Sequence, residues 1–179
     1  GVVIIRSIAT KGDFANLLKQ VLVKRIPYFV GVPDVYSALS RAKLPWYFHM
    51  LHAVKGFISG AAPLAEETMR KFGESFKRGK LLQGYGISEC SPVVSTNVPW
   101  SNRIGSVGQA LPSYQVECFD EQMQPVARDA IGEICVKGDC VMLGYFNRPN
   151  DTAEAIVDVW FRTGGNGKVN QDGLMCIRE

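Results

Sequence analysis

The first half of the chain alternates short apolar runs with stretches of helical periodicity. The apolar runs are residues 2–5, 28–32, 57–59 and 80–83. Between them, apolar residues recur at helical spacing after Asp13, which can cap a helix, and in the stretch from Asp34 to Leu44, and Pro63 opens a further helix. Alternation of strands and helices predicts an α/β fold, with a largely parallel sheet flanked by helices.

The pattern changes from about Gly105 onward. Short β-rich stretches at 115–119, 133–137 and 167–177 are separated by turns, one of them at Asp172-Gly173. One helix interrupts them after Pro149, with the stretch from Asp151 to Glu154 as its capping box. We therefore predict two parts. Residues 1–104 form the α/β part, and residues 105–179 form a smaller, β-rich, antiparallel subdomain.

Composition narrows the class of protein. Of the 179 residues, 46% are hydrophobic and 21% are charged, which is typical of a soluble globular protein. A net charge of +3 is too weak to indicate nucleic-acid binding. Five irregularly spaced cysteines argue against a disulfide framework and against zinc, and they favour reduced thiols in a cytosolic protein. Because the chain starts at Gly1 within an apolar run and stops within a predicted strand, we expect an internal piece of a longer protein.

The segment QGYGISEC holds the densest group of candidate functional residues. It follows a predicted strand, where ligands of α/β sheets bind. Gly84 and Gly86 let the backbone approach a ligand closely, and Tyr85 can stack on a flat ring. Ser88 can donate to a phosphate oxygen, and Glu89 can hold Mg²⁺. The alternative is a tight turn with a surface glutamate, which so short a motif favours by roughly two to one.

Two further groups have a plainer interpretation when each is taken alone. In SGAAPL, the small residues Gly60, Ala61 and Ala62 permit a ligand to come close, but a compact turn before a helix explains them equally well. His49 and His52 lie three positions apart in WYFHMLH, a spacing open to metal ligands. Partly buried core histidines are favoured there by roughly four to one.

The order of the motifs is more specific than any one of them. SGAAPL, GYGISE, RIGSVGQALP, GEICVKGDCVMLGYFNRPNDT and WFRTGG follow one another across about residues 26–177. This series resembles the adenylate-forming superfamily, which includes acyl-CoA synthetases, luciferases and nonribosomal peptide adenylation domains. GYGISECSPVVS and GSVGQALP look most like bacterial fatty acyl-CoA ligases. The resemblance implies ATP, Mg²⁺ and coenzyme A: a carboxylate attacks the α-phosphate of ATP, and a thiol then takes the acyl group from the acyl-adenylate.

The resemblance also implies roles for individual residues. Tyr85, beside Gly84, would stack on adenine, and Ser88 stands where the family usually has a threonine that contacts phosphate. Glu89 would bind Mg²⁺. The three small residues of SGAAPL would line the purine and acyl pockets. Gly86 replaces a bulky tryptophan of acetate-using relatives, so the resemblance implies an open acyl tunnel, lined by Val93 and Val94, and a medium or long acyl chain.

Departures from the family pattern are equally informative. The family's phosphate loop and its C-terminal domain with a catalytic lysine fall outside these 179 residues, and Ser113 replaces a usual glycine. Gly165 stands where the family has an aspartate that accepts hydrogen bonds from both ribose hydroxyls. The glycine-rich WFRTGGNG, open to interpretation as a phosphate loop, would thus be the ribose edge of a nucleotide site without its carboxylate.

The leading hypothesis is a fragment of a fatty acid–CoA ligase that is inactive as an isolated chain. The alternative is a degenerate module of the same fold that binds nucleotide or lipid without catalysis. A third hypothesis is a generic interaction domain, which holds only if the motifs occur in the family's order by chance. The expected partners are a medium- or long-chain fatty acid, ATP and coenzyme A, without nucleic acid. We also expect a cytoplasmic location, peripheral contact with a membrane, and self-association through exposed strand edges.

Overall fold

The computed structural model of the chain describes residues 11–60, 62 and 64–178. The chain divides into two compact units, Gly1–Leu82 and Gln83–Glu179. This division precedes the predicted boundary at 104/105, because residues 83–104 contribute strand β4 (Ser95–Thr96), which pairs with β5 (Gly108–Ala110) in the second unit. The second unit is therefore larger than predicted. The predicted strand at residues 2–5 lies outside the described residues.

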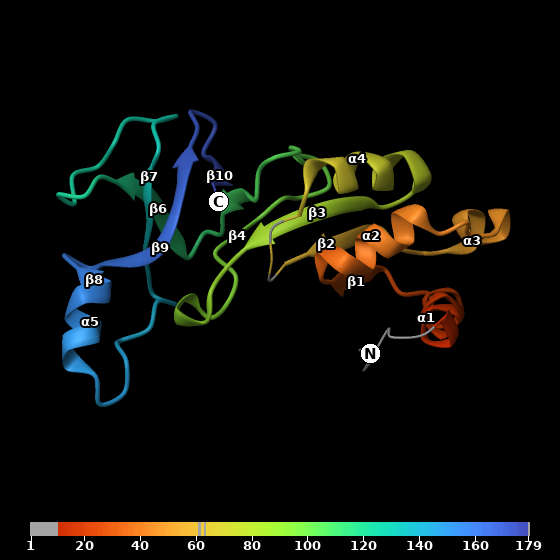
Figure 1. Cartoon of the computed structure of the whole chain (residues 1–179), viewed down its shortest axis with the longest axis horizontal. Coiled ribbons are helices and arrows are strands. Elements are labelled where there is room, and N and C mark those ends of the chain that lie inside the picture. The colour runs from red at the N-terminus through yellow and green to blue at the C-terminus, as the bar shows by residue number, and fades with distance from the viewer. Residues whose placement is uncertain (1–10, 61, 63, 179) are drawn as a thin grey trace. The chain divides into compact units, whose positions relative to one another are not determined.

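The first unit consists of helices around a small sheet (Figure 1). Its elements are α1 (Lys11–Val23), β1 (Tyr28–Gly31), α2 (Pro33–Arg41), α3 (Trp46–Leu51), β2 (Gly56–Ser59), α4 (Glu66–Ser75) and the start of β3 (Lys80–Tyr85). Strand β1 pairs in parallel with β2, and β3 is the other neighbour of β2. The prediction of a mixed α/β fold with helices flanking the sheet is confirmed.

Two predicted helix starts in the first unit differ from the structure. Helix α4 begins at Glu66, and Ala65 before it has non-helical backbone angles, with φ of −57° and ψ of 133°. The sequence predicted a start at Pro63, which lies outside the described residues. Glu66 and Glu67 occupy its first turn, where carboxylates favour the positive end of the helix dipole. In α1, Asp13 lies inside the first turn and not at the cap.

Aromatic rings fill the core of the first unit. Phe72 and Phe76 are one helical turn apart on α4, and their rings stack with centroids 4.3 Å apart. Phe57 of β2 meets Phe72 edge to face, with ring centroids 4.9 Å apart. Because Phe72 has no exposed surface, this contact joins helix to sheet through apolar area removed from water.

Tyr36 ties α2 to both strands of this core. Its ring is fully buried, and its hydroxyl lies 2.7 Å from the carbonyl oxygen of Ile58 and 3.1 Å from that of Phe29. Burial raises the pKa of the Tyr36 hydroxyl above its usual value, so it stays protonated and able to donate. The hydroxyl of Tyr36 thus lies within hydrogen-bond distance of carbonyl oxygens in both β1 and β2.

His52 is a core residue, as the sequence favoured. It is buried between the rings of Phe48, Phe57 and Phe76, and burial lowers the pKa of its imidazole, with smaller contributions from His49 and Arg78. Among the described residues, no group of three or more histidine, cysteine, aspartate or glutamate side chains is placed to hold a metal ion. His52 is therefore a neutral part of the aromatic core.

Among the described residues of the second unit, the paired strands are antiparallel. Its strands are the end of β3, β4, β5, β6 (Tyr114–Phe119), β7 (Gly132–Gly138), β8 (Ile156–Val157), β9 (Trp160–Val169) and β10 (Leu174–Arg178), with η1 (Ser88–Cys90) and α5 (Pro149–Ala155). The sheet order runs β4-β5-β10-β9-β7-β6, and β8 pairs with β9. The prediction of a β-rich antiparallel part is confirmed, including the hairpin turn between β9 and β10.

Helix α5 lacks the predicted capping box. Its N-cap residue is Arg148, which makes no side-chain capping bond, and Pro149 occupies the first turn. Asp151 instead accepts a hydrogen bond from Arg148, with 2.5 Å between Nε and Oδ2. Proline is suited to this position, because its fixed backbone angle matches a helix start and its missing N–H has no partner there in any case.

All five cysteines are free thiols. Burial, with a smaller contribution from a nearby glutamate in each case, raises the pKa of Cys90 to about 11 and that of Cys135 to about 12. Cys118 is also buried. These three thiols therefore behave as small apolar core residues and not as nucleophiles. Within the described ranges, no helix combines the length and the apolar character needed to span a membrane.

Truncating Phe72 tests the aromatic core. We expect Phe72→Ala to lower the free energy of unfolding by about 3–5 kcal/mol, because it leaves a cavity where three aromatic side chains meet. Urea titration followed by circular dichroism measures the change. Phe146→Ala is the matched control: its side chain is 91% exposed, so the free energy should change by no more than about 0.5 kcal/mol. Equal losses from both substitutions would contradict this account of the core.

Candidate functional site

The segment after β3 forms a tight turn around η1. The strand ends at Tyr85, and Ser88, Glu89 and Cys90 form a single 3₁₀ turn that Ser91 closes in the left-handed backbone region, with φ of 53°. Ser88 is exposed, Glu89 is half-buried and Cys90 is fully buried. Burial of the cysteine fixes the turn, and the hydroxyl and carboxylate before it are left accessible for chemistry.

Gly84 and Gly86 are required by the chain's own packing. A Cβ atom at Gly86 would lie 1.8 Å from the carbonyl oxygen of Pro92, and one at Gly84 would lie 3.1 Å from that of Ser95. The sequence predicted that these glycines admit a ligand, but the structure shows backbone of the same unit in the direction that a Gly86 side chain would take. Val94 next to this contact is fully buried in the core, whereas Val93 is 44% exposed.

WFRTGGNG lies within strand β9 and is not the loop that the sequence predicted. The pairing of β9 with β7 is irregular here, since Arg162 is opposite Cys135 and Asn166 is opposite Glu133. Four steps along β9 thus match two steps along β7, and Gly164 adopts a φ of +71°, which glycine tolerates best. The glycines therefore allow a bulge in a long, paired strand.

Hydrogen bonds from polar side chains hold this bulge in place. The guanidinium of Arg162 donates two hydrogen bonds to Glu133 Oε2, at 2.9 and 2.7 Å, and Gly164 N–H donates to Glu133 Oε1 at 3.0 Å. Thr163 Oγ1 donates to the Ile134 carbonyl at 2.8 Å and accepts from Gly165 N–H at 3.2 Å. Glu133 was predicted only as a strand residue. Its spacing from Arg162 gives no signal in a single sequence.

Tyr85 and Gly165 lie next to each other in the second unit. A Cβ atom added to Gly165 would be 3.7 Å from Tyr85 Oη and 3.4 Å from Thr163 Oγ1, both ordinary contact distances. Burial raises the pKa of the Tyr85 hydroxyl, and its hydrogen bond with Thr163 opposes that rise. The structure thus brings together the aromatic residue predicted for adenine and the position predicted for the ribose edge.

Glu89 is held by the segment that precedes α5. Tyr145 Oη lies 3.0 Å from Glu89 Oε1, and Met142 N–H donates to the Glu89 carbonyl at 2.7 Å. The hydrogen bond with Glu89 is the main cause of the raised pKa of Tyr145. A phenol that stays protonated is the donor in this pair, and one carboxylate oxygen of Glu89 accepts from it.

A single carboxylate is a plausible donor set for Mg²⁺ only when a ligand supplies other oxygens. Mg²⁺ in nucleotide sites is commonly bound by one or two carboxylates together with substrate phosphates and water. Glu89 offers such a carboxylate, half-buried and fixed at one oxygen by Tyr145. The residues present therefore fit a magnesium ion that arrives with a nucleotide, and not a site built by the protein alone.

The predicted residues of SGAAPL belong to the first unit. Gly60 follows β2 directly, and a Cβ atom there would meet no atom within 4 Å. Ala62 is exposed, and Ala61 lies outside the described residues. The open space at Gly60 agrees with a surface that a ligand can approach.

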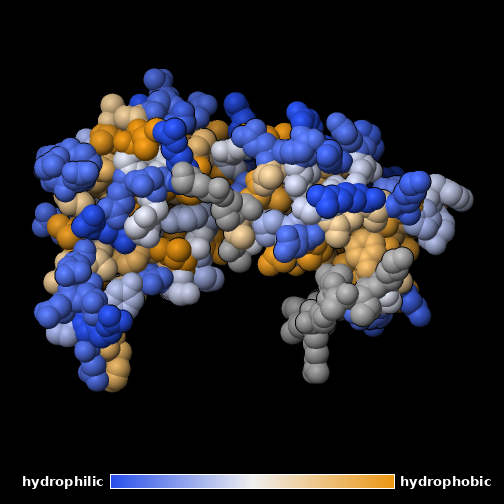
Figure 2. Space-filling view, viewed as in Figure 1, coloured by the Kyte–Doolittle hydropathy of each residue, from blue (hydrophilic) through white to orange (hydrophobic). Residues whose placement is uncertain are grey.

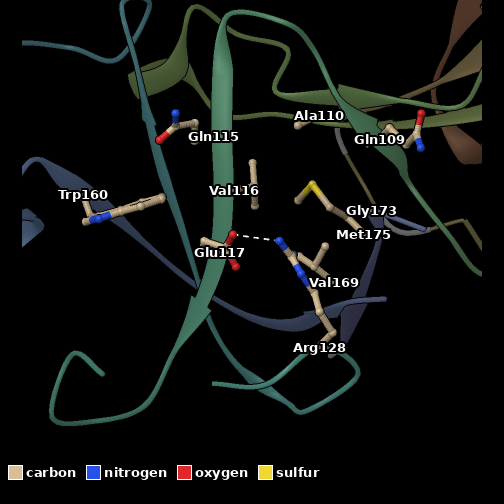
Figure 3. Close-up of a pocket in the computed structure, with 10 residues that line it drawn as sticks. All are labelled: Gln109, Ala110, Gln115, Val116, Glu117, Arg128, Trp160, Val169, Gly173 and Met175. Carbon is tan, nitrogen blue, oxygen red and sulfur yellow. Dashed lines mark hydrogen bonds and ion pairs between the residues drawn. The ribbon is translucent and has the colours of Figure 1, made fainter. Parts of the chain in front are cut away.

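A pocket of about 440 Å³ in the second unit lies apart from the predicted site residues, none of which lines it (Figure 3). Strands β5, β6, β9 and β10 contribute its walls. The charges at its surface are paired, because Arg128 Nη2 lies 2.8 Å from Glu117 Oε1. The pocket therefore offers no unpaired charge from this pair to a ligand.

Comparison with known proteins places these residues in a family. A family model described as "AMP-binding enzyme" matches residues 1–146. The chain is 37% identical over 172 residues to a long-chain-fatty-acid–CoA ligase of Bacillus subtilis (strain 168), covering 94% of this chain and 30% of that protein. It is 30% identical over 177 residues to 4-coumarate–CoA ligase 2 of Solanum tuberosum, covering 95% of this chain and 32% of that protein.

Solved structures agree with the sequence relatives. ATP-bound MatB from Rhodopseudomonas palustris superimposes with a TM-score of 0.83 at 30% identity, covering 91% of this chain and 32% of that structure. A benzoate CoA ligase from Burkholderia xenovorans LB400 shares the fold, with a TM-score of 0.80 at 22% identity. The chain spans about a third of the length of these relatives. On the family match over residues 1–146, the chain belongs to the AMP-binding enzymes.

Proposed function

We propose that the chain carries the nucleotide-facing part of a fatty acid–CoA ligase. The observation that supports this most directly is the cluster of Tyr85, Thr163 and Gly165, with Glu89 held on the turn that follows Tyr85. An aromatic ring, a hydroxyl and a carboxylate are the groups that a purine, a phosphate and its cation require. Two relatives named as CoA ligases, one for long-chain fatty acids and one for 4-coumarate, favour an acyl-CoA product.

The proposed reaction has two steps. An oxygen of the fatty acid carboxylate attacks the α-phosphorus of ATP, and the bond to pyrophosphate breaks to leave an acyl-adenylate. The thiolate of coenzyme A then attacks the acyl carbon, and AMP leaves. In the first step Tyr85 would position the adenine, and Ser88 would donate to a phosphate oxygen. Glu89 would hold Mg²⁺, which neutralises phosphate charge, so positioning and electrostatics supply most of the catalysis.

A medium or long acyl chain is the proposed substrate, and Gly86 supports it. A tryptophan at this position, which would close an acyl tunnel, cannot be placed while the Pro92 carbonyl lies 1.8 Å from the Cβ site. The backbone of this chain is therefore incompatible with the bulky side chain of an acetate-type enzyme. The relative from Bacillus subtilis, named for long-chain fatty acids, agrees with this choice.

A second candidate function is binding without catalysis. Gly165 motivates it, because no carboxylate at that position can accept hydrogen bonds from the ribose hydroxyls. Such a module would hold nucleotide or lipid weakly in the same fold. The two functions differ in the effect of restoring the carboxylate: binding should tighten in both, but adenylation should follow only in the enzyme.

We also propose peripheral contact between the first unit and an anionic membrane. Residues 14–65 contain six lysines or arginines and a single acidic residue, Asp34. On the same unit, a groove of about 390 Å³ between α1 and α3 is lined mainly by apolar side chains, with Lys19 among them. Trp46 is 74% exposed and Leu51 is 55% exposed on α3. Exposed aromatic and apolar residues flanked by cations are typical of interfacial surfaces, and hydrophobic residues at the surface are visible in Figure 2.

Restoring the carboxylate at position 165 tests the ribose assignment. We expect Gly165→Asp to tighten AMP binding by about tenfold or more, because hydrogen bonds to a charged acceptor contribute about 1.5–3 kcal/mol each at best. A Cβ atom at position 165 has ordinary contact distances, so the backbone there accepts a side chain without a clash at its first atom. Isothermal titration calorimetry measures the change, with Gly165→Asn as an uncharged control of the same shape that should gain less. Unchanged affinity in Gly165→Asp would mean that this bulge does not meet the ribose.

The isolated 179-residue chain should not catalyse adenylation. The phosphate loop and the lysine that the family uses for this step do not occur among these residues. With ATP, Mg²⁺, a fatty acid and labelled pyrophosphate, we expect no label to enter ATP. Robust exchange by the purified chain would overturn this expectation.

Membrane contact can be measured by co-sedimentation with lipid vesicles. We expect the chain to bind vesicles of phosphatidylcholine with phosphatidylglycerol and not vesicles of phosphatidylcholine alone. Trp46→Ser with Leu51→Ser should abolish binding, whereas Val159→Ser, an exposed apolar residue of the second unit, should leave it unchanged. Binding that survives the double substitution would refute this surface. Size-exclusion chromatography at several concentrations would reveal self-association instead.

A further inference from the structure

Tyr145 makes a contact with Glu89 that no feature of the sequence indicated. The two residues are far apart in the chain, yet 3.0 Å separates Tyr145 Oη from Glu89 Oε1. Three residues before Tyr145, Met142 N–H donates to the carbonyl oxygen of Glu89 at 2.7 Å. One short segment therefore fixes both the backbone and the side chain of Glu89.

The tyrosine is itself held by α5. The backbone N–H of Tyr145 donates to Thr152 Oγ1 at 2.9 Å. The hydroxyl of Thr152 in turn donates to the Arg148 carbonyl at 2.9 Å. Gly144 before it has a φ of +153°, and a Cβ atom there would lie 2.6 Å from Thr152 Cγ2. Any side chain at position 144 would push the threonine away. The sequence GYFNRPNDT thus places a tyrosine whose backbone is locked to the first turns of a helix.

The geometry leaves one carboxylate oxygen of Glu89 for a cation. Tyr145 donates to Oε1, so this oxygen is partly committed, whereas Oε2 is the atom available for a metal. A hydrogen bond of this kind orients a carboxylate ligand, and the loss of such a partner typically reduces metal affinity 10–100-fold. The half-buried phenol also limits the rotation of the Glu89 side chain.

We propose that Tyr145 is a positioning residue that orients Glu89 toward the magnesium ion of a bound nucleotide. The proposal rests on the proposed function, in which Glu89 is the metal ligand. Tyr145 acts through Glu89 and touches neither metal nor nucleotide. Thr152 contributes indirectly, because its hydroxyl accepts a hydrogen bond from the backbone N–H of Tyr145.

The test measures ATP binding by calorimetry as a function of Mg²⁺ concentration, using the 179-residue chain. Tyr145→Phe removes the donor and keeps the ring. We expect the Mg²⁺ concentration needed for half-maximal enhancement of ATP binding to rise about tenfold, while ATP affinity in EDTA is unchanged. Thr152→Val should shift the same midpoint in the same direction by less. Tyr47→Phe, on the exposed surface of the first unit, is the matched control and should shift nothing.

A double-mutant cycle separates positioning from general structure. In a Glu89→Gln background, Tyr145→Phe should have no further effect on the Mg²⁺ midpoint, because the metal ligand that it orients is gone. An unchanged midpoint in Tyr145→Phe, with Mg²⁺-dependent binding intact, would refute the positioning role and leave the proposed function standing. Equal loss of ATP affinity in EDTA and in Mg²⁺ would refute it as well, since that is the signature of a structural role. Absence of ATP binding in the unmodified chain would overturn both.

Discussion

The carboxylate of Glu133 is the constraint on which the bulge in strand β9 depends. Strand β9 carries two more residues than β7 across the same stretch, and the surplus must be accommodated without losing the pairing on either side. Both oxygens of Glu133 are committed to β9, one to the fork of Arg162 and the other to the amide of Gly164. Because the Arg162 guanidinium and the Gly164 amide both donate to the same planar carboxylate, these hydrogen bonds restrict the conformation of the bulge.

Several glycines of the second unit are needed because backbone atoms of neighbouring segments lie where a side chain would be. At Gly86, the nearest atoms to an added Cβ belong to Pro92 and Val93, which turn the chain from η1 back to β4. Gly108 has the same character, since a Cβ atom there would lie about 2 Å from the backbone of Thr96. These contacts let short strands of the second unit lie close together. Backbone contacts within the unit therefore account for these two glycines.

The sequence predicted the elements well where periodicity is strong and less well where tertiary contacts decide. Strands β1, β2 and β6 lie within a residue or two of their predicted bounds, because short runs of aromatic and β-branched residues are typical of strands. The predicted start of α4 and the predicted cap of α5 were wrong: α4 begins after Ala65, and Asp151 of the predicted capping box accepts a hydrogen bond from Arg148 instead. WFRTGGNG was interpreted as a loop because glycine is rare in strands. Only the pairing partners on both sides reveal that it is a bulged strand.

The contact at Gly86 has a consequence for how substrate range can change. Under the proposed function, a shorter acyl pocket cannot arise from one substitution at this position, because even a methyl group would collide with the Pro92 carbonyl. Pro92 and Val93 would have to move first, and Val94 behind them is locked in the core by its own burial and by its hydrogen bond to Tyr85. Conversion toward small acids is therefore a route of several coupled steps, each unfavourable without the next. If the proposed acyl site is at Gly86, backbone packing there would by itself oppose a change from bulky to small acyl substrates.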